Sequence, residues 1–185
     1  MGFLAHRLEK IRKESDFFIR FHLEEMEPAR QEGGKKIVTF KPAGEAFRDL
    51  VTVTVTVDGE GRIREMELVL TRSFVDDTAN GIYARDIAKS LLSAAVPREN
   101  QADVAGLVGE IEIPISPAQP ASGTGRAQPQ PPGSQTLGYQ VFLGKEKHYE
   151  QVLSRCVVRL ENHSGALKMS LSSRDQSRLT PSSRP

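Results

Sequence analysis

Four histidines are the residues of this sequence best suited to acid–base or metal chemistry: His6, His22, His148 and His163. His6 and His22 lie 16 residues apart in a segment that predicts a helix. They would be about 24 Å apart along its axis, too far to share one metal ion. His148 and His163 flank a predicted strand at its opposite ends. No pair has the i, i+4 spacing of a helical metal site, so the sequence predicts no metal and no other cofactor.

Cys156 is the only cysteine, which excludes an intramolecular disulfide and a cysteine-rich zinc site. It lies inside a predicted strand, on the apolar face by the alternation of the neighbouring residues. This position favours a small buried apolar side chain. The alternative is a nucleophile activated by a histidine close in space, a contact that sequence spacing does not reveal.

Asp76, Asp77 and Asp86 form the densest group of carboxylates at a structurally defined point. Such a group could bind a divalent cation or act as an acid–base cluster. The alternative is structural, since Asp76 and Asp77 suit the positive end of a helix dipole as caps. Asp86 lies beside Arg85 and Lys89 on a predicted solvated helix face. We therefore predict no catalytic residue.

Basic residues are concentrated in the C-terminal part of the chain. Residues 1–115 carry 16 Lys and Arg against 20 Asp and Glu, whereas residues 116–185 carry 9 against 4. A basic patch on one sheet face could be formed by Lys145, Lys147, Arg155 and Arg159. Such a patch suggests nucleic-acid binding as an alternative function, although RNA-binding sheets add exposed aromatic residues, which are few here.

The clearest predicted element among those that position these residues is a β-hairpin. Residues 50–57 predict a strand in which valine and threonine alternate after Leu50. Residues 58–61 (Asp-Gly-Glu-Gly) predict a turn, and residues 62–71 alternate again. A helix is predicted over residues 77–96, because apolar residues repeat there every four positions. Its stripe suits the apolar face of the hairpin.

The first segment predicts an amphipathic helix over residues 3–26. Its apolar face contains Leu4, Leu8, Ile11 and Phe18. Such a face either packs on the chain's own sheet or binds a partner, and we retain it as a candidate partner-binding face.

Further strands are expected over residues 37–40, 107–115, 137–143, 152–160 and 167–171. Residues 116–136 are rich in Pro, Gly and Gln and predict a linker or an exposed loop. Residues 137–172 are expected to supply three antiparallel strands that complete the sheet of the N-terminal part (residues 1–115), and residues 173–185 a disordered tail. The predicted fold class is α+β, a mainly antiparallel sheet of about seven strands packed with two helices.

The order helix, three strands, helix, strand resembles that of small secretion-chaperone-like α/β folds. The resemblance lies in element order alone, without matching motifs. No apolar run of about 18 residues is present, and charges come too early for a signal-peptide core, so a cytoplasmic protein without a membrane span is expected.

We therefore predict a non-enzymatic protein-binding, adaptor or chaperone-like protein that forms homo-oligomers. The alternatives are a nucleic-acid-associated protein that uses the basic C-terminal half, and a small-ligand-binding protein or enzyme. The last would have its pocket between the 77–96 helix and the sheet.

Overall fold

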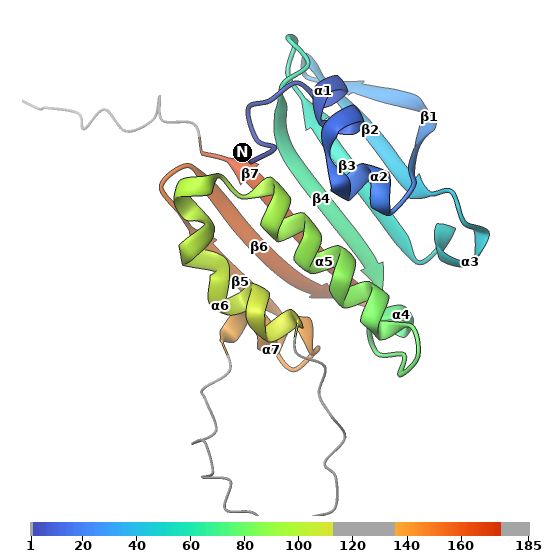
Figure 1. Ribbon diagram of the computed structural model, residues 1–185, viewed down its shortest axis with the longest axis vertical. Coiled ribbons are helices and arrows are strands. Elements are labelled where there is room, and N and C mark those ends of the chain that lie inside the picture. The colour runs from blue at the N-terminus through green and yellow to red at the C-terminus, as the bar shows by residue number, and fades with distance from the viewer. Residues whose placement is uncertain (1, 113–135, 175–185) are drawn as a thin grey trace, which may run out of the picture.

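The computed structural model describes residues 2–112 and 136–174, which form an antiparallel sheet with helices against one face (Figure 1). The described sheet has seven strands in the spatial order β1-β2-β3-β4-β7-β6-β5. These strands are β1 (Leu23–Glu32), β2 (Lys35–Pro42), β3 (Val51–Val57), β4 (Ile63–Thr71), β5 (His148–Val152), β6 (Cys156–His163) and β7 (Ala166–Ser173). The predicted α+β class with a mainly antiparallel sheet of about seven strands is confirmed.

The centre of the core is the predicted hairpin, β3 and β4. Alternate residues of a strand point to one face, and every valine of β3 is buried while its threonines are only half-buried on the other face. Val53 pairs with Leu68 and Val55 with Met66, and all four side chains are at most 1% exposed. Pairing of β7 with β4 extends this apolar face by Leu167, Met169 and Leu171.

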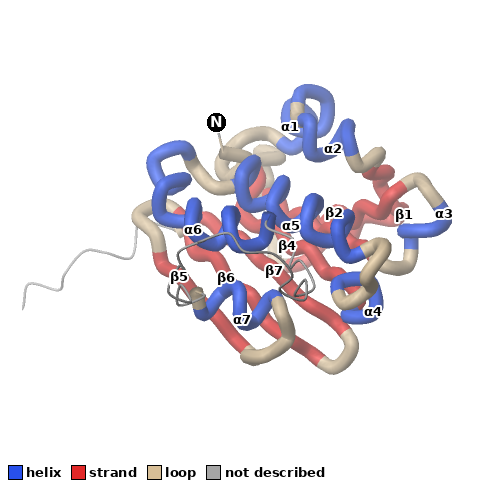
Figure 2. The backbone as a smooth tube through the Cα atoms, turned by 60° about the horizontal axis from the view of Figure 1, so that its bottom comes forward, coloured by secondary structure: helices blue, strands red, loops and turns tan. Residues whose placement is uncertain are grey.

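The described helices are α1 (Leu8–Glu14), α2 (Asp16–Arg20), α3 (Glu45–Arg48), α4 (Arg72–Val75), α5 (Gly81–Ala95), a 3-10 helix (Arg98–Asn100), α6 (Gln101–Glu112) and α7 (Leu137–Phe142). Helices α1, α2, α5, α6 and α7 lie on the same side of the sheet (Figure 2). Helix α5, predicted over residues 77–96, packs along the central strands through its buried stripe of Ala84, Ile87, Ala88, Leu91, Leu92 and Ala95.

The opposite face of the sheet carries charged side chains that bind one another across strands. Lys168 Nζ on β7 lies 2.7 Å from Glu67 Oε2 on β4, and Arg159 on β6 binds Glu150 on β5. Antiparallel sheets with one apolar face and one face of paired polar residues commonly have the polar face in contact with solvent.

The prediction of one helix over residues 3–26 is wrong, because helical structure is limited to α1 and α2. Ser15 has an extended backbone between them, and its Oγ accepts the backbone N–H of Phe17 at 3.1 Å, which caps α2. Residues from Leu23 onward form β1. This edge strand is rich in charge and contains Pro28, as edge strands often do, so it lacks the apolar alternation that would have predicted it.

The strands predicted over residues 107–115 and 137–143 are also wrong. Residues 107–112 belong to α6, in which Val104, Leu107 and Ile111 are buried at the three- and four-residue spacing of one helix face. Residues 137–142 form α7, which is capped by the side chain of Thr136. The strand predicted over residues 152–160 is divided, because β5 ends at Val152 and β6 begins at Cys156. The three C-terminal strands are β5, β6 and β7, and they lie in the same sheet as β1–β4.

Most of the proline-rich segment 116–136, and the predicted tail after Arg174, lie outside the described residues. No described helix is long and apolar enough to cross a membrane.

Candidate functional site

A cavity of about 310 Å³ opens between the start of α5, the end of β2 and the start of β3. Four aromatic rings from four parts of the chain line it: Phe21 after α2, Phe47 on α3, Phe74 on α4 and Tyr83 on α5. Other lining residues are Arg20, His22, Pro42, Gly44, Val51, Asp86 and Ile87. This aromatic cavity lies between α5 and the sheet, the location considered above for a small-ligand pocket.

Three of the rings form a chain that leads from the core to the surface. The Phe47 ring centroid lies 5.7 Å from that of Phe74 and 5.6 Å from that of Tyr83, both in tilted geometry. Phe74 is buried, whereas Tyr83 is 54% exposed. Gly81 permits this arrangement, since a Cβ at that position would stand 2.9 Å from the Val75 carbonyl oxygen. Helix α5 can therefore start directly against α4, which places Tyr83 beside Phe47.

The polar side of the aromatic cavity is an ion pair between two helices. Arg20 Nη2 at the end of α2 lies 2.5 Å from Asp86 Oδ2 on α5, and its guanidinium also lies 5.5 Å from the Phe21 ring centroid. The Arg20 side chain is 59% exposed. Exposed pairs of this kind contribute at most about 1 kcal/mol, so a bound molecule can displace Arg20 at little cost.

His22 has a backbone conformation that is unusual for a non-glycine residue, with φ at 45°. Its carbonyl oxygen accepts the backbone N–H of Ala43 at 2.9 Å, which joins the α2–β1 turn to the end of β2. Left-handed conformations cost L-residues about 1–2 kcal/mol, and strained residues concentrate at binding sites.

Two further hollows continue the aromatic cavity along the seam between α2 and α5. A hollow of about 240 Å³ shares Arg20 and Phe21 with it, and a third, of about 300 Å³, shares Asp16, Phe17 and Ala94 with the second. We call these three together the α2–α5 groove. From Tyr83 to Ala94 the groove follows α5 for about 16 Å.

A large exposed apolar side chain, that of Tyr83, lines this groove. Among the described residues, the large apolar side chains that are more than half exposed are Ile19, Ile82, Tyr83, Leu137 and Val152. Ile19 and Ile82 also belong to α2 and α5, but neither lines any of the three hollows. An apolar cavity with an exposed aromatic residue at its edge is typical of an interaction site.

The candidate partner-binding face of the first segment lies inside the molecule. Leu4, Leu8, Ile11 and Phe18 are 6%, 8%, 8% and 4% exposed and belong to the core cluster. They cover the sheet of their own chain.

The acidic residues each have a partner within the chain. Asp76 binds Arg72, Asp77 Oδ1 accepts the N–H groups of residues 79 and 80 at the turn before α5, and Asp86 binds Arg20. In the described ranges, no group of three or more His, Cys, Asp or Glu side chains is placed to hold a metal ion.

The four residues of the candidate basic patch are divided between separate places. Lys147 lies beside Asn162 near the end of β6, because its carbonyl oxygen accepts the Asn162 N–H at 2.8 Å. Lys145 is two residues away, whereas Arg155 precedes the start of β6, about 23 Å along the strand. Arg159 is paired with Glu150 on the helix-free face.

Cys156 is fully buried at the start of β6, and burial raises the pKa of its thiol to about 11. Since only the thiolate reacts, the native protein is expected to react with a disulfide reagent at least about 100-fold more slowly than the urea-unfolded chain. The release of coloured thiolate measures both rates. Equal rates would show that Cys156 is accessible and activated.

Comparison of the chain with protein-family models, with curated proteins and with solved structures finds no match.

Proposed function

We propose that this chain is a non-catalytic protein-binding protein whose binding site is the α2–α5 groove. The observation that carries the proposal is the lining of the aromatic cavity, where four aromatic rings converge and one of them, Tyr83, is 54% exposed at the edge. Single exposed apolar residues are ordinary on protein surfaces, but an exposed aromatic side chain at the edge of an apolar cavity is typical of an interaction site.

The shape of the groove favours a protein segment over a small molecule. Pockets for small molecules enclose most of the ligand surface, whereas Tyr83 at the edge of this cavity is 54% exposed. The groove follows α5 for about 16 Å, the length of about five residues of extended peptide or three turns of helix. The aromatic cavity, with room for about ten water molecules by volume, is suited to one bulky apolar side chain of that segment.

A displayed library of random peptides, selected on the full chain, tests this proposal. We expect the selected peptides to share a large apolar residue, and Tyr83→Ala to weaken their binding by about 30-fold or more, because aromatic anchors dominate such contacts. Leu137→Ala is the matched control, since Leu137 is 52% exposed on α7 and outside the groove. Melting curves confirm that both variants are folded.

Other outcomes would contradict the proposal. Peptides that bind Tyr83→Ala as tightly as the wild type would place the site elsewhere. Selection of no peptide, together with Tyr83-dependent binding of a small aromatic probe such as indole, would favour the small-ligand alternative. If a second copy supplies the segment, the predicted self-association should be lost in Tyr83→Ala, which sedimentation measures.

A further inference from the structure

A separate cavity, of about 430 Å³, is lined by the N-terminal segment, the start of β4 and the end of β7. Figure 1 shows the N-terminal segment beside β7, at the end of α5 opposite to α4. Four arginines from different parts of the chain line it: Arg64 on β4, Arg98 after α5, Arg155 before β6 and Arg174 after β7. We call it the arginine cavity. Among the described residues, the only carboxylate in its lining is that of Glu99.

Two of these arginines are held by carboxylates. Arg155 Nε lies 2.9 Å from Glu99 Oε1, and Arg64 Nη2 lies 2.8 Å from Asp58 Oδ2 at the adjacent hairpin turn. Asp58 also binds Arg62, so its charge is shared between two guanidinium groups.

The other two arginines have no carboxylate partner among the described residues. Arg174 Nη1 donates to the Leu153 carbonyl oxygen at 3.4 Å, a neutral acceptor, and Arg98 is exposed. Four guanidinium groups thus face two carboxylates, even when Asp58 is counted, which leaves a net charge of +2 around one concave site.

The N-terminal segment forms one wall of this cavity in a tightly fitted conformation. A Cβ at Gly2 would stand 2.7 Å from the backbone of Pro97, so only glycine allows this approach. Ala5 has φ at 68°, in the left-handed region, and its N–H donates to the Ile63 carbonyl oxygen at 2.8 Å. The wall is therefore held in place by packing and hydrogen bonding, and the conformation of Ala5 is one that binding sites often retain despite its cost.

Phosphate is the anion that best matches these side chains, because a guanidinium group donates two parallel hydrogen bonds to two phosphate oxygens. No Phe, Tyr or Trp among the described residues lines the cavity, so it lacks the stacking surface that nucleobases use. Lys145 and Lys147 lie at the other end of β6, which leaves no continuous basic track for a nucleic-acid backbone. We propose that the arginine cavity binds a small molecule through its phosphate groups, with pyrophosphate as the minimal ligand.

Calorimetric titration of the full chain with pyrophosphate at about 50 mM salt tests this proposal. We expect saturable binding of one pyrophosphate per chain. Arg98→Gln and Arg174→Gln should each weaken it about tenfold, because each removes charge-assisted hydrogen bonds. Both positions are at least partly exposed, so these variants should fold, and melting curves verify this.

The matched control is Arg159→Gln, which removes the same charge from the helix-free face of the sheet. Its affinity for pyrophosphate should stay within about twofold of the wild type, because distant exposed charges are screened by salt. Absence of saturable binding, or an equal loss in Arg159→Gln, would overturn the proposal. A single-stranded oligonucleotide that binds the chain and is not displaced by pyrophosphate would overturn it in favour of nucleic-acid binding.

Discussion

Deletion of residues 1–22 is expected to unfold the chain. The described part of this segment buries six large apolar side chains against the sheet: Phe3, Leu4, Leu8, Ile11, Phe17 and Phe18. At about 1.5–3 kcal/mol for each buried side chain, their loss removes roughly 9–18 kcal/mol. That is as large as the whole net stability of a typical domain, about 5–15 kcal/mol. Far-UV circular dichroism and the dispersion of amide NMR signals of the truncated chain measure the outcome.

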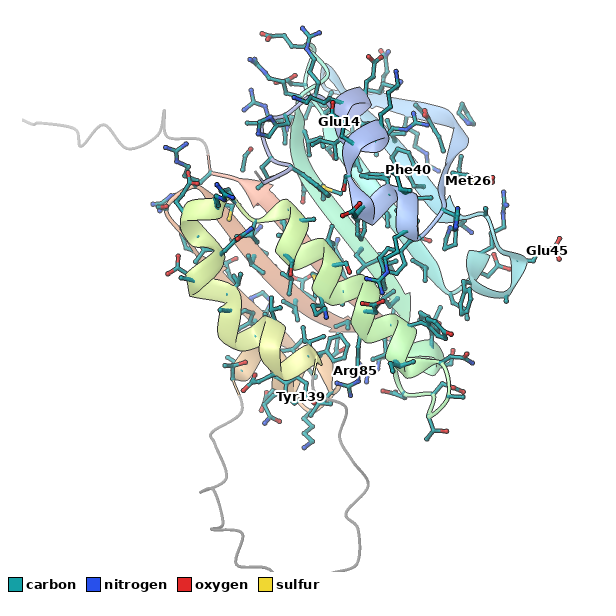
Figure 3. All side chains as sticks on the ribbon, viewed as in Figure 1. Glu14, Met26, Phe40, Glu45, Arg85 and Tyr139 are labelled. Carbon is teal, nitrogen blue, oxygen red and sulfur yellow. The ribbon has the colours of Figure 1, made fainter. Side chains whose placement is uncertain are left out.

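A matched pair of substitutions on α2, one at a buried position and one at an exposed position, tests whether packing against the sheet stabilises the fold. The Phe18 ring lies 5.1 Å from that of Phe40, which Figure 3 places beneath the N-terminal helices, and 5.5 Å from that of Phe17. Phe18→Ala should therefore lower the free energy of unfolding in urea by about 3–5 kcal/mol. Ile19→Ala, at a neighbouring position that is 52% exposed, should change it by less than about 0.5 kcal/mol.

The opposite result would restore a different function to the first segment. A truncated chain with the spectrum of a folded sheet, or equal effects of Phe18→Ala and Ile19→Ala, would show that this segment is dispensable for folding. Its apolar face would then be free for a partner, as the amphipathic pattern first suggested.

The central hairpin and α5 were predictable because a single local pattern determines each of them. Alternation of valine with threonine suits only a strand with one buried face, and the Asp-Gly-Glu-Gly turn fixes its return. In α5 the apolar spacing of four residues holds over the whole helix. Such patterns survive folding because tertiary contacts reinforce the local preference.

Short apolar segments did not distinguish a strand from a helix. In α6 the residues Leu107 and Ile111 fit both an alternating strand and a helix face, and only Val104, outside the segment considered, completes the helical spacing. Strand β1 was missed for the converse reason. Backbone hydrogen bonds to β2 hold this strand in the sheet, and the pattern of its charged side chains does not indicate such pairing.

The candidate sites depend on tertiary structure even more strongly. Phe21, Phe47, Phe74 and Tyr83 are spread over more than sixty residues with no regular spacing, and the fold brings them to one end of α5. The four arginines of the other cavity span an even longer part of the chain. Composition showed only that basic residues are in excess near the C-terminus. It did not show that Lys145 and Lys147 lie at one end of β6 and Arg155 at the other.

One side chain, which no sequence pattern marks, joins α4 to α7 and β6. Arg72, at the start of α4, is 18% exposed, and its Nη1 donates to the Phe142 carbonyl oxygen at 2.9 Å and to Asn162 Oδ1 at 3.3 Å. Its other nitrogens bind Asp76. One guanidinium group thus connects α4 with the end of α7 and with β6, which follow it by about 70 and 90 residues in the sequence.

Arg72→Ala is expected to lower the free energy of unfolding by about 2–3 kcal/mol. The substitution leaves the Phe142 carbonyl oxygen and Asn162 Oδ1 without their arginine donor in a partly buried place, and unmade hydrogen bonds of this kind are costly. Asp76 also loses its partner, but it is 59% exposed, so water replaces most of that contact. Urea titration should show the midpoint lowered with an unchanged slope, and the melting temperature should fall by about 5–10 °C.

The matched control is Arg159→Ala, which also removes an arginine from an arginine–carboxylate pair. Arg159 and Glu150 are 37% and 38% exposed on the helix-free face, so solvent replaces the lost contact and the effect should stay below about 1 kcal/mol. Equal effects of the two substitutions would mean that Arg72 acts as an ordinary surface residue. The contact between α4, α7 and β6 would then be stabilised by apolar packing alone, through residues such as Phe74 and Phe142.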